Sequence, residues 1–291
     1  MFGNYVRVAT AAPEIRVADT AFNASALVAA AKRAADEGVQ ILVLPELMLT
    51  GSTAADLFLF DSLEIAAEKA VAEVLRQTAE MPVVLVTSVP LQWRGRLYNA
   101  AVVLQNGRIL GAVPKMILGN YGENYELRQF CPGDAAPVDI HWCGQDFPFG
   151  ADILFDCGGS CTFAVEVGGE LTAPVPPSVG HALAGANLIL NPAAESQTIG
   201  KTGYRRQLAE AHSARLACGY VYANAGLGES TQDLVFAGHC LIAENGNLLG
   251  VYCSGTAWTC SSCIDRGYAP GCTPEQEKMM LRGPKGELEA S

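Results

Sequence analysis

Residues 39–47 read VQILVLPEL, a continuous apolar run that ends in Pro45 and Glu46. An uninterrupted apolar run of this kind is typical of a strand buried on both faces of a sheet. An amphipathic stretch precedes it, with Asp19 placed to cap a helix and Gly38 placed to end it. A helix that leads directly into a buried strand indicates an α/β domain.

The same alternation of helical and strand-like segments continues along the chain. Two hairpins are expected, because Asn106-Gly107 and Asn245-Gly246 each join two apolar runs and Asn-Gly strongly favours a type I′ turn. Further strands are expected at residues 6–13, 82–91, 152–159, 161–167, 187–193 and 220–226, and further helices at 62–81, 177–186 and 203–219. Strands interleaved with helices predict a layered α/β arrangement.

The chain has 291 residues, half of them hydrophobic, and can bury a substantial core as one large domain or two small ones. No internal linker divides it. We therefore expect one domain over residues 1–252, followed by an irregular, flexible tail over residues 253–291, where the periodicity is lost.

A formal net charge of -11 argues against nucleic acid or an anionic membrane surface as the main partner. No apolar run approaches the roughly 18 residues of a membrane helix. The N-terminus has no charged segment followed by an apolar one, so no secretory signal is predicted. A cytoplasmic protein that acts on small molecules or other proteins is the expectation.

Ten cysteines are many for a cytoplasmic chain. Four of them, Cys253, Cys260, Cys263 and Cys272, crowd into the tail. The spacing of Cys260 and Cys263 is that of a zinc knuckle or a redox pair. However, no second pair at that spacing and no nearby histidine completes a site. We expect free thiols and no metal.

Three positions lie where strands are expected to end, and active sites of α/β folds are usually found at strand ends. Glu46 ends the apolar run, where burial disfavours the charged carboxylate and can raise its pKa toward that of a general base. Lys115 ends the hairpin at 97–115, where a partly buried ammonium can stabilise an oxyanion. The loop at 168–170 is where a nucleophile would stand. Taken alone, Glu46 also fits a structural ion pair and Lys115 a solvated strand end.

Longer blocks carry a family resemblance: PELMLTG (45–51), VPKMILGNYGENYELRQF (113–130), PVPPS (174–178), IGKTGYRRQL (199–208) and YVYANAGLGESTQDLVFAGHCLIAENGNLLG (220–250). Together they resemble the glutamine amidotransferase domain of bacterial glutamine-dependent NAD synthetases. That domain belongs to the nitrilase, or carbon–nitrogen hydrolase, superfamily. The resemblance covers residues 5–252, and the GESTQDL loop at 228–234 sets it apart from simpler nitrilases. It implies an α/β fold, the nitrilase-like αββα four-layer sandwich, with a Glu–Lys–Cys catalytic set.

The resemblance also implies roles for individual residues. Glu46 matches the general base, Lys115 the lysine that stabilises the transition state, and Glu123 the additional glutamate of the superfamily. Tyr121 matches a residue of the glutamine pocket. Lys201 matches a basic position near the substrate carboxylate.

The nucleophile expected from the resemblance is absent. The family motif E-I-C-E-D-L-W aligns with residues 166–172, which places Gly168 at the cysteine and Gly169 at its acidic neighbour. Ser52 stands at an aromatic position of the family. Glu195 stands where a small hydroxyl residue would help to bind glutamine. Cys161 is seven residues upstream, roughly 23 Å along an extended strand, and an odd offset points it to the opposite face.

The synthetase domain that follows in the family is also expected to be absent, because nothing resembles its ATP-binding SGGxDS-type loop. ATP and magnesium would belong to that domain, so no cofactor is expected in this one. The resemblance implies the ammonia-supplying glutaminase portion of a longer protein, or a stand-alone module, with Gly168 closing the thioester route.

Two alternatives stay open. One is a non-catalytic binding or assembly module that partners a synthetase, and the other is a divergent hydrolase that directs water at another amide. The expected partners are glutamine or a related small amide, a synthetase domain or subunit, and further copies of the chain in a homo-oligomer.

Overall fold

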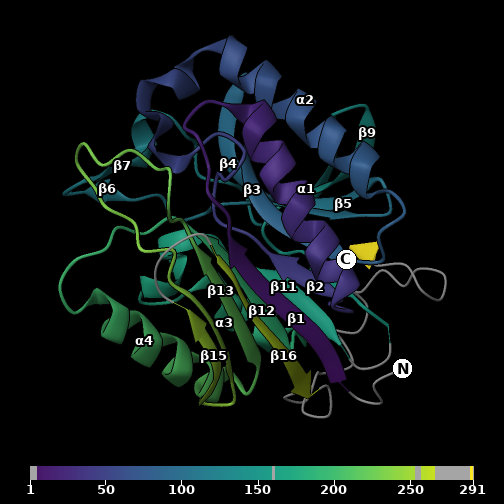
Figure 1. Ribbon diagram of the computed structural model, residues 1–291, viewed down its shortest axis with the longest axis vertical. Coiled ribbons are helices and arrows are strands. Elements are labelled where there is room, and N and C mark those ends of the chain that lie inside the picture. Colours follow the sequence, from purple (N-terminus) through teal and green to yellow (C-terminus); the bar gives the residue numbers. More distant parts are fainter. Residues whose placement is uncertain (1–4, 159–160, 253–256, 266–288, 291) are drawn as a thin grey trace.

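The computed structural model describes residues 5–158 and 161–252, together with two strands at 257–265 and 289–290. It contains two large sheets that pack face to face (Figure 1). The first sheet is eight-stranded and is built from β1 (Tyr5–Ala12), β2 (Ile41–Val43), β3 (Val84–Trp93), β4 (Arg96–Gln105), β5 (Arg108–Pro114), β8 (Val138–Trp142), β9 (Gln145–Phe149) and β16 (Ala257–Asp265). Its strand order is β16-β1-β2-β3-β4-β5-β9-β8.

The second sheet is seven-stranded. It is built from β10 (Phe155–Asp156), β11 (Thr162–Val165), β12 (Leu188–Ala193), β13 (Gly219–Asn224), β14 (Cys240–Glu244), β15 (Asn247–Tyr252) and β17 (Glu289–Ala290). The order is β15-β14-β13-β12-β11-β10-β17, with β11, β12 and β13 parallel. Strands β2 and β12 end on the same side as the loops that carry the candidate residues, which concentrates those residues at one edge of the sandwich.

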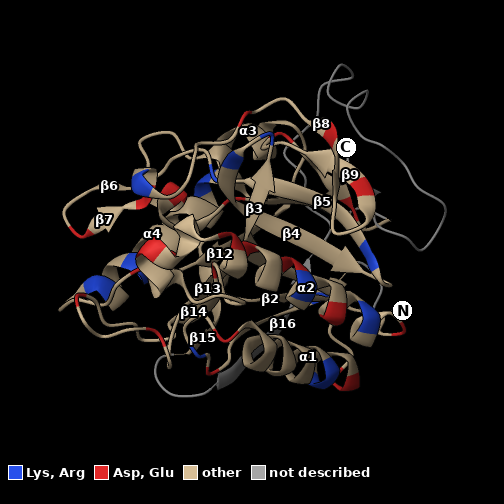
Figure 2. Cartoon of the chain, turned by 90° about the horizontal axis from the view of Figure 1, so that it is seen from above, with Lys and Arg blue, Asp and Glu red and all other residues tan. Residues whose placement is uncertain are grey.

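Helices cover the two outer faces. Helices α1 (Thr20–Asp36) and α2 (Asp61–Thr78) pack on the first sheet, and α3 (Pro177–Leu183) and α4 (Lys201–Leu216) pack on the second. Alternate residues of each strand face opposite layers: Ile41 and Val43 point between the sheets, whereas Leu42 packs against the helices. Figure 2 shows the charged residues mainly on helices and loops, with the sheets between them largely tan. The four-layer αββα sandwich is confirmed.

The local signals behind this fold are also borne out. The Asp19 side chain accepts a hydrogen bond from Phe22 N (3.1 Å) and so caps α1. Asn106 and Gly107 have φ of 50° and 72°, and Asn245 and Gly246 have 44° and 85°, as type I′ turns require.

The structure differs from the expected irregular tail at two places. Strand β16 pairs antiparallel with the whole of β1, from Tyr5 opposite Asp265 to Ala12 opposite Ala257, and β17 pairs with β10. Without β16, β1 would be a bare edge strand with unpaired backbone groups. The rest of the tail (253–256, 266–288 and 291), with Cys253 and Cys272, and the side chains of Cys260 and Cys263 lie outside the described part of the chain.

No helix in the described residues is long and apolar enough to cross a membrane. Shorter elements complete the edge where the candidate residues gather. These are three 3-10 turns, η1 (Ser52–Leu59), η2 (Glu126–Arg128) and η3 (Gly168–Thr172), and a small hairpin formed by β6 (Asn120–Tyr121) and β7 (Asn124–Tyr125).

Candidate active site

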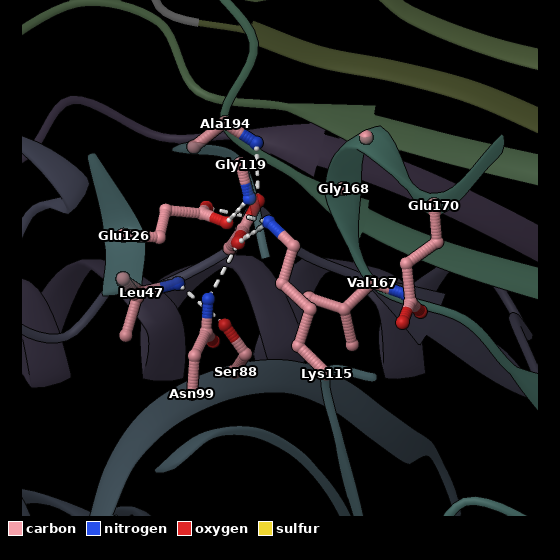
Figure 3. A network of polar contacts seen from close by, with 12 residues as sticks. Leu47, Ser88, Asn99, Lys115, Gly119, Glu126, Val167, Gly168, Glu170 and Ala194 are labelled. Carbon is pink, nitrogen blue, oxygen red and sulfur yellow. Dashed lines mark hydrogen bonds and ion pairs between the residues drawn. The ribbon is translucent and has the colours of Figure 1, made fainter. Parts of the chain in front are cut away.

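Glu46 lies just beyond β2, between the two sheets, and its side chain is 3% exposed. Its Oε1 accepts hydrogen bonds from Asn99 Nδ2 (2.5 Å) and from Lys115 Nζ (2.8 Å). Its Oε2 accepts one from the backbone N–H of Ala194, after β12 (2.9 Å). Burial raises the pKa of Glu46, against the opposing Lys115 ammonium. Both carboxylate oxygens are thus engaged by donors from both sheets. Figure 3 labels these donors, Asn99, Lys115 and Ala194.

Lys115, directly after β5, lies between two carboxylates. Its Nζ is 2.8 Å from Glu46 Oε1 and 2.6 Å from Glu126 Oε1. The other oxygen of Glu126 accepts from Gly119 N (2.7 Å), which fixes that side chain under the loop. Burial would lower the pKa of Lys115, but the charges of Glu46 and Glu126 outweigh it and raise the pKa. The two carboxylates therefore favour the charged form of this buried lysine.

Gly168 begins η3 immediately beside this pair (Figure 3). A Cβ at position 168 would overlap Oε2 of Glu46 and would lie 3.0 Å from Lys115 Nζ. The backbone has a φ of +58°, a region that side-chain-bearing residues rarely adopt. The structure thus brings together Glu46, Lys115 and Gly168, and the Glu46 carboxylate fills the space that a side chain at 168 would need.

Glu123 does not reach Lys115. It accepts a hydrogen bond from Ser196 Oγ (3.2 Å). A backbone hydrogen bond is the main cause that lowers the pKa of Glu123, and the bond from Ser196 lowers it further. Glu126, three residues later, is the glutamate that contacts Lys115, with its Oε1 2.6 Å from Nζ. The tight β6–β7 hairpin turns the chain back, so the glutamate after the hairpin rather than the one at its tip faces the ammonium. The catalytic role of either glutamate stays a prediction.

Two of the three predicted substrate-binding residues lie together at one cavity, and the third, Tyr121, is exposed on the β6–β7 hairpin. Glu195 and Lys201 line the same cavity as Lys115 and Gly169. Glu195 is within 3.9 Å of Arg205 Nε, and its Oε2 accepts a long hydrogen bond from Tyr222 OH (3.4 Å). Tyr121, the last residue of β6, is 91% exposed.

A second cavity adjoins the first, and both are bordered by Glu46, Asn124, Glu126 and Ala194. Aromatic residues Phe58, Phe130 and Phe236 line it, and Ser52 contributes to its wall. Glu229 of the GESTQDL loop closes this wall, since its carboxylate accepts from the backbone N–H of Ser52 (2.8 Å) and of Thr53 (3.0 Å). That structural link was not apparent from the sequence, where the motif served only to mark the family.

Among the residues that the structure describes, no group of three or more His, Cys, Asp or Glu side chains is arranged to hold a metal ion.

Glu170 joins the Lys115 loop to the Gly168 turn and is 1% exposed. One carboxylate oxygen accepts from Met116 N (2.6 Å) and Ile117 N (3.0 Å), and the other accepts from Val167 N (2.7 Å). Burial raises the pKa of Glu170 to about 7, although these backbone donors lower it. One side chain therefore sets the spacing of the two segments that carry the site.

We expect Glu170→Gln to lower the free energy of unfolding by about 1–3 kcal/mol, since an amide cannot accept all three backbone hydrogen bonds. The variant should also flatten the pH dependence of stability. Between the pKa that Glu170 has in the unfolded chain and its folded pKa of about 7, this carboxyl group holds a proton in the folded protein that it releases on unfolding. Its proton-linked contribution to the free energy of unfolding is therefore present at low pH and is lost as the pH rises to about 7. Urea denaturation at pH 4.5, 6 and 7.5 measures both effects. The exposed Glu14→Gln is the control, and parallel pH profiles for all three proteins would contradict the assignment.

A model of the carbon–nitrogen hydrolase family matches residues 7–259. The chain belongs to the carbon–nitrogen hydrolase family. Curated relatives of this carbon–nitrogen hydrolase include the glutamine-dependent NAD(+) synthetases of Mycobacterium bovis, 42% identical over 84% of this chain and 36% of that protein, and of Homo sapiens, 25% identical over 84% and 36%. The chain thus spans about a third of the length of these relatives.

Solved structures agree on the fold. A glutamine-dependent NAD(+) synthetase from Cytophaga hutchinsonii superposes with a TM-score of 0.77 at 27% identity, covering 90% of this chain and 43% of that one. An amidase from Nesterenkonia sp. superposes with a TM-score of 0.73 at 22% identity, covering 96% of this chain and 97% of that one. This chain therefore shares its fold with nearly the whole of the amidase and with less than half of the synthetase.

Proposed function

We propose that this chain is the glutaminase-type domain of a glutamine-dependent NAD synthetase, and that it has lost thioester chemistry because glycine stands at the nucleophile position. The observation that carries the proposal is the place of Gly168, whose absent side chain would meet both Glu46 and Lys115. A thiol at that position would have a base and a cation in contact with it. The similarity to NAD synthetases, whose names include glutamine, supports glutamine as the ligand.

The parent reaction assigns a task to each group. A thiol at 168 would attack the carbonyl carbon of the glutamine amide while Glu46 takes its proton. Lys115 would stabilise the oxyanion of the tetrahedral intermediate, and Glu46 would return the proton to the departing ammonia. Water would then hydrolyse the thioester. We assign the supporting glutamate to Glu126, because it holds Lys115 directly.

Without the thiol, the same groups form a closed network. Glycine offers no atom for attack, and both oxygens of Glu46 already accept hydrogen bonds. Oε2 of Glu46 accepts only the N–H of Ala194 and so keeps a lone pair, but with glycine at 168 there is no thiol beside it whose proton it could take.

The second candidate is a non-catalytic assembly module of the same complex, which the fully paired Glu46–Lys115–Glu126 group favours. In both cases the proposed partners are a synthetase domain or subunit, where ATP and magnesium would bind, and further copies of this chain in a cytoplasmic homo-oligomer. No cofactor is proposed for this domain itself.

Calorimetric titration of the chain with L-glutamine separates the two candidates. Saturable binding that is weakened in Lys201→Ala supports the glutaminase-derived pocket. An oligomer without measurable affinity for glutamine, L-glutamate or simple amides supports the assembly module instead.

A further inference from the structure

A buried chain of hydrogen bonds leads from the Gly168 carbonyl into the second sheet. Asn191 on β12 donates through Nδ2 to the Gly168 carbonyl oxygen (3.1 Å) and to the hydroxyl oxygen of Tyr220 (2.8 Å). Tyr220 on β13 donates to Oε1 of Glu166 (2.5 Å). Asn191, Tyr220 and Glu166 are each 0% exposed, so water does not compete for these bonds.

The chain continues from Glu166 to the outer helices. Oε2 of Glu166 accepts from Ser178 N (3.1 Å) at the beginning of α3, and the Ser178 hydroxyl also bonds this carboxyl group. Ser178 Oγ is 2.7 Å from His212 Nε2 on α4. On the other side of the imidazole, Nδ1 of His212 is 2.8 Å from a guanidinium nitrogen of the exposed Arg215.

The hydrogen bonds that lead from Arg215 through His212, Ser178, Glu166, Tyr220 and Asn191 to the Gly168 carbonyl form a relay. Their donor directions follow from the groups at its two ends, a guanidinium that only donates and a carbonyl oxygen that only accepts. A guanidinium can only donate, so Nδ1 of His212 accepts from Arg215. Burial, followed by the charge of Arg215, lowers the pKa of His212 to about 4, and the neutral ring therefore carries its proton on Nε2. Nε2 donates to Ser178 Oγ, which leaves the Ser178 hydroxyl proton for Glu166. The donors from Arg215 through His212 and Ser178, and the hydroxyl of Tyr220, thus point toward Glu166, whereas Asn191 donates both to Tyr220 and to the Gly168 carbonyl.

We propose that Glu166 is a positioning residue for the turn at Gly168. The relay from Arg215 holds the Glu166 carboxyl group in one place, and Tyr220 and Asn191 transmit that position to the Gly168 carbonyl. The positive φ of Gly168 and its contact with Glu46 and Lys115 depend on the orientation of this peptide. As a role in catalysis this rests on the proposed function, whereas the relay itself is independent of any ligand.

Nuclear magnetic resonance of the full isotope-labelled chain, without ligand, tests the relay. The carbonyl carbon resonance of Gly168 is expected to shift in Tyr220→Phe and in His212→Leu, because each removes one link. His212→Gln should retain the native resonance, since its amide can accept from Arg215 and donate to Ser178. The double variant should shift no further than the larger single change. In the unsubstituted protein, the imidazole nitrogens should show the proton on Nε2.

Val74→Ala on α2 is the control for general destabilisation, because Val74 is buried in the other layer. It should lower the melting temperature without moving the Gly168 resonance. A native Gly168 resonance in both Tyr220→Phe and His212→Leu, or a proton on Nδ1 of His212, would overturn the proposal. Failure of glutamine binding would overturn the proposed function and leave these resonances as expected, so the two failures are distinguishable.

Discussion

Replacing Lys115 by Met is expected to lower the free energy of unfolding by about 3–5 kcal/mol at pH 7, because it removes one partner of a buried ion group and leaves the other charges uncompensated. Methionine keeps the length of the side chain but not its charge. Glu46, 3% exposed, then faces Glu126 without the intervening ammonium. Urea denaturation of both proteins measures the loss.

The pH dependence of this loss and a control variant both test the role of the buried charge. The loss should be smaller at pH 5 than at pH 7, since burial raises the pKa of Glu46 and this carboxylate can take up a proton once the ammonium is gone. The matched control is Lys201→Met, which removes a half-buried lysine whose ammonium contacts Ser196 Oγ at 3.3 Å, and which should change stability by less than about 0.5 kcal/mol. Equal losses in the two variants would show that the buried ion group has no special weight.

Gly168→Ala is expected to destabilise the fold by roughly 1–3 kcal/mol from the backbone alone, because alanine is strained at a φ of +58°. Further destabilisation should come from displacement of the Glu46 carboxylate, which the new methyl group would overlap. In this chain, glycine relieves strain that any nucleophile at 168 would impose. Under the proposed function, the loss of a thiol at 168 would thus exchange activity for stability.

Gly169→Ala provides the comparison for this effect. Its Cβ would meet only Glu195 Oε1, at 3.2 Å, and the position has no positive φ. Thermal unfolding should therefore show a clearly smaller decrease for Gly169→Ala than for Gly168→Ala. Indistinguishable melting temperatures would refute the idea that position 168 is a strained nucleophile site relieved by glycine.

The sequence was informative wherever chemistry is local. The cap at Asp19, the Asn-Gly turns and the apolar run through Ile41 and Val43 predicted the elements and their order, because each depends on neighbouring residues. The convergence of Glu46 and Lys115 followed from their positions at strand ends together with the family resemblance.

The remaining features depend on contacts that the sequence does not display. Strand β16 lacked a periodic pattern that would have predicted it, and it is defined by pairing with β1, more than two hundred residues away. Which of Glu123 and Glu126 contacts Lys115 depends on the path of the short β6–β7 hairpin. The relay to Glu166 draws on four separate elements, so no local spacing of Ser178, His212 and Tyr220 could have indicated it.

Whether position 168 is the site of the lost nucleophile is tested most directly by ammonia release from L-glutamine. The chain as it stands is compared with its Gly168→Cys variant, with both proteins shown to be folded. We expect no release above background from the unsubstituted chain and measurable release from the variant, abolished when Lys115→Met is added. Release by the unsubstituted chain would contradict the claim that position 168 is the lost nucleophile.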